Sequence, residues 1–291
     1  MSAIAREPAA GSMVAPLRHA KFRNIWLASL LSNFGLLIQG VGAAWAMTEL
    51  TGSASMVALV QTATMLPVLL IAIPAGALSD MYDRRTLSIV ALLISLIAVG
   101  SLFALSLAGA VSAYSLLGFC FAIGCGMALF WPAWQASVRE QVPAETLAAA
   151  VALNSISFNI ARSFGPAIGG AIVAAAGAVA SFGASVFLYL PMLATLLLSP
   201  RTHEPPRLPP ERLGRALISG VRYILHSPPI RAVIWRSLIL GLLAGSVTAL
   251  MPLIARDLLH AEAGTFGVLL GAYGIGAVVG AFSVQRVRGR I

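Results

Sequence analysis

Long apolar runs separated by short polar gaps dominate this sequence. The runs do not alternate between apolar and polar positions as barrel strands do, and they reach the ~20 residues that a helix needs to cross a ~30 Å hydrocarbon core. Because lipid offers no hydrogen-bond partner to backbone groups, helices are the expected structure. We predict eight spans, at residues 24–47, 54–79, 86–108, 111–137, 144–175, 178–199, 232–255 and 264–284.

The composition indicates the same class of protein. Of the 291 residues, 59% are hydrophobic and only 10% are charged, whereas soluble domains average about 25% charged residues. The net charge of +9 could suggest nucleic-acid binding, but the basic residues fall in the short gaps between apolar runs rather than on one face. The expected partner is therefore the lipid bilayer, and no nucleic acid is expected.

Lysine and arginine occupy every second polar gap. They occur in the N-terminal tail, in the gaps near residues 84 and 139, between 200 and 236 and in the C-terminal tail, whereas the alternate gaps contain only Arg256. The positive-inside rule then predicts a multi-pass membrane protein with a cytoplasmic N-terminus. The first apolar run is too long for a signal peptide, so we expect it to be retained.

The sequence offers little for metal binding or catalysis. Cys120 and Cys125 lie in one apolar run at a spacing that does not put them on one helix face, and no histidine lies within a run. No nucleophile–base pair or metal cluster occurs at a membrane face. We therefore expect no cofactor, no metal and no enzymatic activity.

The stretch GALSDMYDRR, residues 76–85, concentrates charge between two runs without any. Topology accounts for Arg84 and Arg85 as cytoplasmic anchors of the third span. It does not account for Gly76, which permits close approach of another helix, or for Asp80, because anions are disfavoured at helix C-termini.

The fifth run contains a group of small residues, Gly165, Pro166, Gly169 and Gly170. A proline flanked by glycines predicts a kinked helix that packs closely against its neighbours.

The same run carries Arg162, about seventeen residues beyond the preceding gap and the one charge deep within a span. Ser155, Asn159 and Arg162 share a helix face at positions i, i+4 and i+7. A buried arginine usually faces a cavity or a partner. Two roles stay open for Arg162: attraction of an anionic group on a transported solute, or bonding to carbonyls of an adjacent helix.

Other polar residues within spans are candidates for lining a cavity, namely Asn33, Gln39 and Gln61, with Trp131, Trp134 and Gln135 of the fourth span as further polar or amphipathic positions. The alternative is that these side chains hydrogen-bond neighbouring helices together. No Asp or Glu sits deep in any span, so the sequence assigns no proton relay.

Residues 76–85 resemble the signature of the loop between spans 2 and 3 of the major facilitator superfamily, with departures at Met81 and Asp83. This resemblance implies that Gly76 lets span 2 pack against a span 11. It also implies that Asp80, with Arg84 and Arg85, acts as a conformational latch rather than contacting substrate.

Two further stretches indicate which group within the superfamily the sequence resembles. Gly165 to Gly170 resembles the C-terminal half of the superfamily's span-5 antiporter motif, with Ala152 and Ala161 where earlier glycines are common. Residues 131–170 and 16–35 resemble the enterobactin-exporter-like group, or transmembrane secretion effectors. The resemblance runs from about residue 16 to the last residue and implies antiport.

The resemblance implies an all-α, multi-pass protein of the bacterial inner (plasma) membrane with a major-facilitator-type bundle. Its expected parts are a cytoplasmic tail (1–23), a six-helix bundle (24–199), a cytoplasmic linker with an amphipathic helix (200–231) and the first two helices of a second bundle (232–291). Since the family has twelve spans, a chain truncated after span 8 is expected.

The implied function is export of a small molecule, such as a siderophore or a drug, by alternating access. A proton or another ion is the candidate coupling partner. The alternatives are a metabolite importer of the same superfamily and a non-transporting membrane scaffold or sensor.

Overall fold

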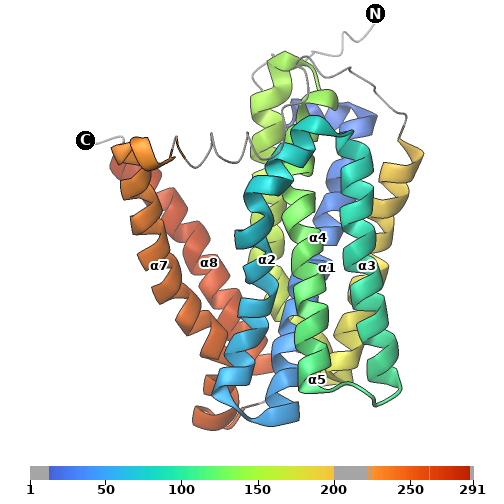
Figure 1. Cartoon of the computed structure of the whole chain (residues 1–291), viewed down its shortest axis with the longest axis vertical. Coiled ribbons are helices and arrows are strands. Elements are labelled where there is room, and N and C mark those ends of the chain that lie inside the picture. The colour runs from blue at the N-terminus through green and yellow to red at the C-terminus, as the bar shows by residue number, and fades with distance from the viewer. Residues whose placement is uncertain (1–12, 200–221, 223, 262, 289–291) are drawn as a thin grey trace, which may run out of the picture.

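The computed structural model describes residues 13–199, 222, 224–261 and 263–288, without the side chains of Asp80 and of residues 277–288. Over this part of the chain the structure is helical throughout (Figure 1). The predicted amphipathic helix of the linker lies almost wholly outside the described residues.

The described part of the chain contains seven long helices: α1 (Ala20–Thr51), α2 (Ala54–Met81), α3 (Arg84–Leu107), α4 (Ala113–Ser137), α5 (Leu147–Leu198), α7 (Pro228–Leu253) and α8 (Ala263–Arg288). Short helical turns adjoin them: η1 (Ala15–Arg18), η2 (Val138–Glu140), η3 (Ala144–Thr146) and the π-helical η4 (Ile254–Leu258). Among the described residues, six helical segments are long and apolar enough to cross a membrane.

The 52-residue helix α5 is two spans joined at Gly177. An unbroken helix of that length would be about 78 Å long, more than twice the thickness of the hydrocarbon core. Gly177 has φ 77° and ψ 170°, a conformation that suits glycine, and the chain reverses direction there (Figure 1). The eight predicted helices are thus all present, with boundaries shifted by a few residues.

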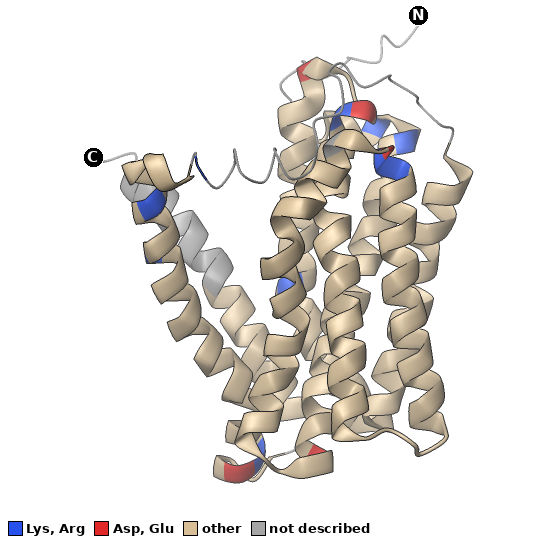
Figure 2. Cartoon of the chain, in the orientation of Figure 1, with Lys and Arg blue, Asp and Glu red and all other residues tan. Residues whose placement is uncertain are grey.

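Charged residues gather at the two ends of the bundle (Figure 2). One end, which we call the basic end, contains Lys21, Arg84, Arg85 and Arg139 near the helix termini. The opposite end, which we call the far end, contains the helix-terminating Gly52 and the reversal at Gly177.

Small residues let the helices of the bundle approach closely. A Cβ atom on Gly42 of α1 would lie 1.7 Å from the Ser181 hydroxyl of α5, and one on Gly124 of α4 would lie 2.2 Å from the Thr64 carbonyl of α2. The Ser185 hydroxyl donates to the Gly35 carbonyl at 2.7 Å. Such contacts are the usual means of helix association where lipid removes the hydrophobic drive between helices.

The glycine-rich stretch of α5 faces two different helices. Added Cβ atoms on Gly165 and Gly169 would lie 3.0 Å from the Leu37 side chain and 3.1 Å from the Ile38 Cα, both on α1. Gly170 instead faces α8, where an added Cβ would lie 2.6 Å from the Gly267 Cα. The sequence predicts close packing here, and the structure identifies α1 and α8 as the partners.

Helices α7 and α8 lie against the bundle at the far end and lean away from it toward the basic end (Figure 1). On α7, residues 231–244 are all exposed, whereas Pro252 and Leu253 are buried. At the far end Arg256 donates from Nη1 to the Thr48 carbonyl of α1 and pairs with Asp257. The far end is therefore closed by contacts between α1 and the segment joining α7 to α8.

We predict that Gly267→Val destabilises the protein by about 1–3 kcal/mol, the usual cost of overpacking. The added side chain would have to displace backbone, because its Cβ would lie 2.7 Å from both the Gly170 Cα and the Pro166 carbonyl oxygen. Gly276→Val on the same helix is the matched control, since no atom lies within 4 Å of its added Cβ. Thermal unfolding in detergent measures both; equal melting temperatures would contradict the prediction.

Candidate functional site

A cavity of about 370 Å³ opens between α1, α4 and the first stretch of α5 (147–176), toward the basic end. Six of its lining residues are polar, four are aromatic and none is charged. They are Ser29, Asn33, Phe130, Trp131, Trp134, Gln135, Val138, Val151, Asn154, Ser155, Phe158 and Asn159.

Two aromatic pairs build one wall of the cavity. Phe130 and Trp134, one turn apart on α4, have ring centroids 5.9 Å apart and an interplanar angle of 9°. Trp131 meets Phe158 of α5 edge to face, with centroids 6.3 Å apart. Both geometries are favourable for aromatic side chains, so the wall presents aromatic surface fixed by contacts between α4 and α5.

Several polar lining groups are already bonded to the protein. Asn159 donates from Nδ2 to the Ser155 carbonyl at 2.8 Å, and the Ser155 hydroxyl donates to the Val151 carbonyl at 3.2 Å. Asn33 of α1 donates to the Ser157 hydroxyl at 3.4 Å. Asn154 differs, because its Oδ1 is buried and has no hydrogen-bond partner among the described residues.

The structure brings together six of the nine cavity candidates that the sequence offers. The six are Asn33, Trp131, Trp134, Gln135, Ser155 and Asn159. Gln39 and Gln61 do not: Gln39 is packed inside the bundle, only 2% exposed, and Gln61 is exposed on α2.

Arg162 lies on α5 one turn beyond Asn159, outside the cavity lining. Its side chain is exposed and makes no hydrogen bond or ion pair with a described residue. The second role considered for it, bonding to carbonyls of an adjacent helix, is therefore not seen in this part of the chain.

Asn154 and Phe158 are cavity residues that the sequence does not single out. Their spacing of i, i+4 places both on one face of α5, and Asn154 directly precedes the candidate Ser155. This spacing is the only feature of the sequence that could have indicated them. The apolar residues around them do not show which face of α5 meets α4.

The charged stretch at the basic end caps and connects helices. Asp83 is the N-cap of α3 and accepts hydrogen bonds from the Thr86 backbone N–H at 3.0 Å and from its hydroxyl at 2.6 Å. Burial alone would raise the pKa of the Asp83 carboxyl, but the bonds from Thr86 and the nearby Arg85 together lower the pKa below its ordinary value. The departure from the superfamily signature at Asp83 thus has a local structural reason.

The two arginines hold α3 to its neighbours. Arg84 pairs with Glu140 of η2 at 2.9 Å and donates to the Ala136 carbonyl of α4. Arg85 donates to the Leu196 and Leu197 carbonyls at 2.6 and 2.8 Å, so it caps the C-terminal end of α5, where carbonyls lack helical partners.

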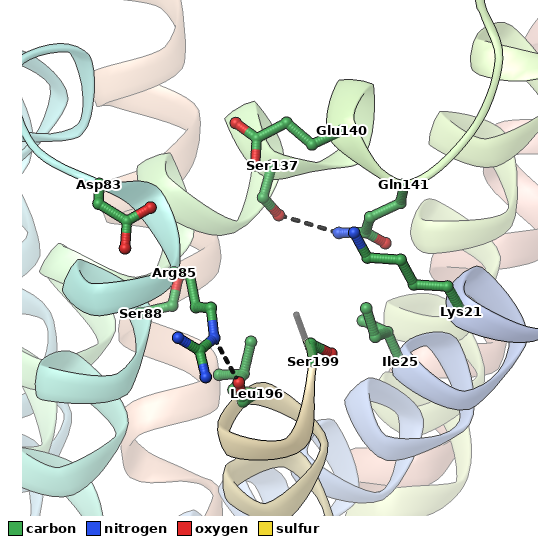
Figure 3. Close-up of a pocket in the computed structure, with 10 residues that line it drawn as sticks. All are labelled: Lys21, Ile25, Asp83, Arg85, Ser88, Ser137, Glu140, Gln141, Leu196 and Ser199. Atoms are coloured by element: carbon green, nitrogen blue, oxygen red, sulfur yellow. Dashed lines mark hydrogen bonds between the residues drawn. The ribbon is translucent and has the colours of Figure 1, made fainter. Parts of the chain in front are cut away.

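These contacts surround a small pocket of about 40 Å³ (Figure 3). In Figure 3 Arg85 points at Leu196, while Gln141 donates to the Ser137 hydroxyl at 3.0 Å on the opposite side. Of the other latch candidates, the Asp80 side chain lies outside the described residues, and an added Cβ on Gly76 would meet no described atom within 4 Å.

The family model described as transmembrane secretion effector matches residues 11–291. The chain belongs to this family of the major facilitator superfamily. It is therefore a multi-pass membrane protein of a transporter family and not an enzyme.

Two transport proteins are similar to this chain at low identity. The enterobactin exporter EntS of Citrobacter koseri is 28% identical over 278 residues, which cover 91% of this chain and 63% of the exporter. The staphyloferrin A transporter of Staphylococcus aureus is 24% identical over 263 residues, covering 89% of this chain and 66% of that transporter. The chain thus spans about two thirds of the length of these relatives.

A solved structure shares the fold. It is the crystal structure of a bacterial homologue of the human lysosomal transporter Spinster, in an inward-facing and unoccupied conformation. The TM-score is 0.69 at 15% sequence identity, covering 95% of this chain and 64% of the homologue. The predicted all-α, major-facilitator-type fold is confirmed.

We predict that Asp83→Ala lowers the melting temperature at neutral pH, because loss of an N-cap costs about 0.5–2 kcal/mol. Asp83→Asn, which preserves a side-chain oxygen, is the control and is expected to retain most of the stability.

The difference between wild type and Asp83→Ala is expected to shrink in acid. Because the folded-state pKa of Asp83 is lowered, the carboxylate stabilises the fold above its unfolded pKa of about 4 and loses that effect as the pH falls through the folded value. Thermal unfolding between pH 7 and pH 3 tests this. A difference that stays constant over that range would contradict it.

Proposed function

We propose that this protein exports a small organic molecule of the siderophore or drug class by alternating access. The observation that carries the proposal is the uncharged cavity, lined by aromatic rings and amides, that lies between helices of a membrane-spanning bundle. Ligand sites are typically of this kind, mostly apolar with a few placed polar groups. The similarity to the enterobactin exporter supports export as the direction, and the similarity to the staphyloferrin A transporter supports a small-molecule substrate.

The orientation proposed from the sequence agrees with the distribution of charge in the structure. Arginine and lysine gather at the basic end, whereas Arg256 at the far end is paired with Asp257. With the basic end in the cytoplasm, the cavity lies toward the cytoplasmic side, and α7 and α8 lean away from the bundle on that side. A substrate of an exporter would enter the cavity from the cytoplasm in such an arrangement.

We propose that the helices divide into two parts, as the sequence suggested. Helices α1 to α5 form the first bundle, and α7 and α8 begin the second. The two meet at the far end, where Gly170 faces Gly267 and Arg256 reaches the Thr48 carbonyl. Rocking of the two parts about these contacts would expose the cavity alternately.

Arg162 is proposed to attract an anionic group on the solute. It lies fifteen residues from Leu147 and fifteen from Gly177, about 22 Å from either end of its helical stretch. An unpaired guanidinium at that depth is costly, and an anion on the substrate would reduce the cost. The resemblance of the fifth span to the antiporter motif favours antiport, with a proton as the candidate counter-ion.

The test is export from a bacterial host whose own siderophore and drug exporters are deleted. Cells that express this protein are expected to release enterobactin, staphyloferrin A or ethidium faster than cells with an empty vector. Absence of export of all such compounds by a correctly inserted protein would overturn the proposed function.

Arg162→Ala is expected to reduce export of an anionic substrate at least tenfold, with Arg162→Lys intermediate, because lysine retains the charge without the planar fork. Export of a cationic substrate such as ethidium should not fall. Arg139→Ala is the matched control, since Arg139 is exposed in η2 and outside both the spans and the cavity. Normal anion export by Arg162→Ala would remove Arg162 from the site.

A further inference from the structure

Arg256 connects η4 to the C-terminal end of α1 at the far end of the molecule. Its Nη1 donates to the Thr48 carbonyl, which also accepts the Gly52 backbone N–H at 3.2 Å. A carbonyl oxygen has two lone pairs, so it can accept both hydrogen bonds. Because carbonyls at the C-terminus of a helix carry partial negative charge, a cation is favourable at this position. Arg256 therefore caps α1 from a different part of the chain.

The neighbouring residue holds the guanidinium of Arg256 in the orientation that this cap requires. Asp257 accepts from Nε at 2.6 Å and from Nη2 at 3.2 Å, and two bonds to one carboxylate fix the plane of a guanidinium. Nη1 is then directed at α1. Gly52, with φ 60°, lies beside the group, since an added Cβ would be 3.5 Å from Nη2. Asp257 is thus a positioning residue for Arg256.

The backbone that carries Arg256 has an uncommon conformation. In the π-helical η4, the Leu259 N–H donates to the Ile254 carbonyl at 3.1 Å. Such turns are rare and occur frequently at functional sites. Ala255, directly before the arginine, is completely buried in an apolar cluster that includes Trp45 of α1. The π-helical turn therefore places a packed residue and a capping cation next to each other, both against α1.

The contact depends on how the two parts of the molecule are arranged. Toward the basic end, residues 231–244 of α7 are all exposed and α7 leans away from the bundle (Figure 1). At the far end, Pro252 and Leu253 are buried and Arg256 reaches α1. Opening of the far end would separate η4 from α1 and break this bond. An interaction that is made in only one of two states shifts the equilibrium toward that state.

We propose that Arg256, oriented by Asp257, is a far-end latch that stabilises the arrangement closed at the far end and open toward the basic end. The latch sets how often the far end opens and not what the cavity binds, because neither residue lines the cavity. This inference rests on the proposed alternating access and goes beyond it by naming the residue that biases the two states. It does not depend on the identity of the solute.

Distances between pairs of spin labels, measured by pulsed electron paramagnetic resonance on the whole chain in nanodiscs, test the inference without requiring transport. Both cysteines are first replaced by alanine. One pair of labels is placed at Ser55 and Leu259 at the far end, and the other at Glu145 and Val233 toward the basic end; all four positions are exposed. Rocking lengthens the first distance and shortens the second, whereas local loosening of η4 changes only the first.

Arg256→Gln is expected to raise the ratio of far-end-open to far-end-closed molecules roughly three- to tenfold, the range that one net hydrogen bond provides. The side chain is 33% exposed, so solvent screening keeps the effect within that range. Arg256→Lys should lie between wild type and Arg256→Gln, because lysine keeps the charge without the planar fork. Asp257→Asn should shift the ratio in the same direction by a smaller factor.

Arg236→Gln is the matched control. Arg236 is also on this part of the chain and exposed on α7, and it makes no hydrogen bond or ion pair with a described residue. Its substitution should leave both distances unchanged. If Arg256→Gln melts at a lower temperature than wild type, Asp257→Asn provides the second measurement.

Three outcomes would overturn the inference: unchanged distances in both Arg256→Gln and Asp257→Asn, a longer far-end distance without a shorter one toward the basic end, or an equal shift in Arg236→Gln. Export is measured separately. A protein that shows the expected shift but exports none of the tested compounds would refute the proposed function and leave the far-end latch in place.

Discussion

The contact between two glycines, Gly170 of α5 and Gly267 of α8, is the constraint on which the arrangement of this molecule depends. Lipid tails are as apolar as the side chains that face them, so helices associate in a membrane through close packing rather than through removal of apolar surface from water. The backbones of α5 and α8 pack so closely here that a Cβ on either glycine would clash with its partner. Side chains elsewhere can adjust, but backbone in contact with backbone cannot.

Helix α5 carries both this contact and part of the cavity lining. Asn154 and Phe158 face the cavity near its basic end, Gly165 and Gly169 face α1, and Gly170 faces α8. Both surfaces therefore belong to one continuous helical stretch. Pro166 lies between the two regions and removes one backbone hydrogen bond at that point, which is where such a helix would bend.

Much of the fold could be predicted from sequence because uninterrupted apolar runs of the required length have few alternatives in a membrane. Even the reversal at Gly177 follows from a run too long for one span. The sequence did not predict in the same way which side of each helix packs against the rest of the protein. Spans that are apolar on all sides give little signal of which face meets protein, which is why Gln39 and Gln61 were expected in the cavity beside Asn33 and lie elsewhere.

The side chains that cap individual helix ends could not be predicted from the sequence either. Asp83 departs from the superfamily signature, and only the structure shows that it caps α3 while Arg85 caps the end of α5. Similarly, the glycines of the fifth span indicate a close contact without indicating the partner, since α8 lies about a hundred residues away in the chain. Which helices pack together depends on the assembled bundle and cannot be read from any single stretch of the sequence.

The hydrogen bond from Arg256 to the Thr48 carbonyl responds differently to substitution of its two residues. A main-chain acceptor is presented by whatever residue occupies position 48, so substitutions there leave the acceptor in place. Substitution of Arg256, by contrast, removes the donor. One substitution can thus remove the contact between η4 and α1, and neither of the two residues in that contact lines the cavity.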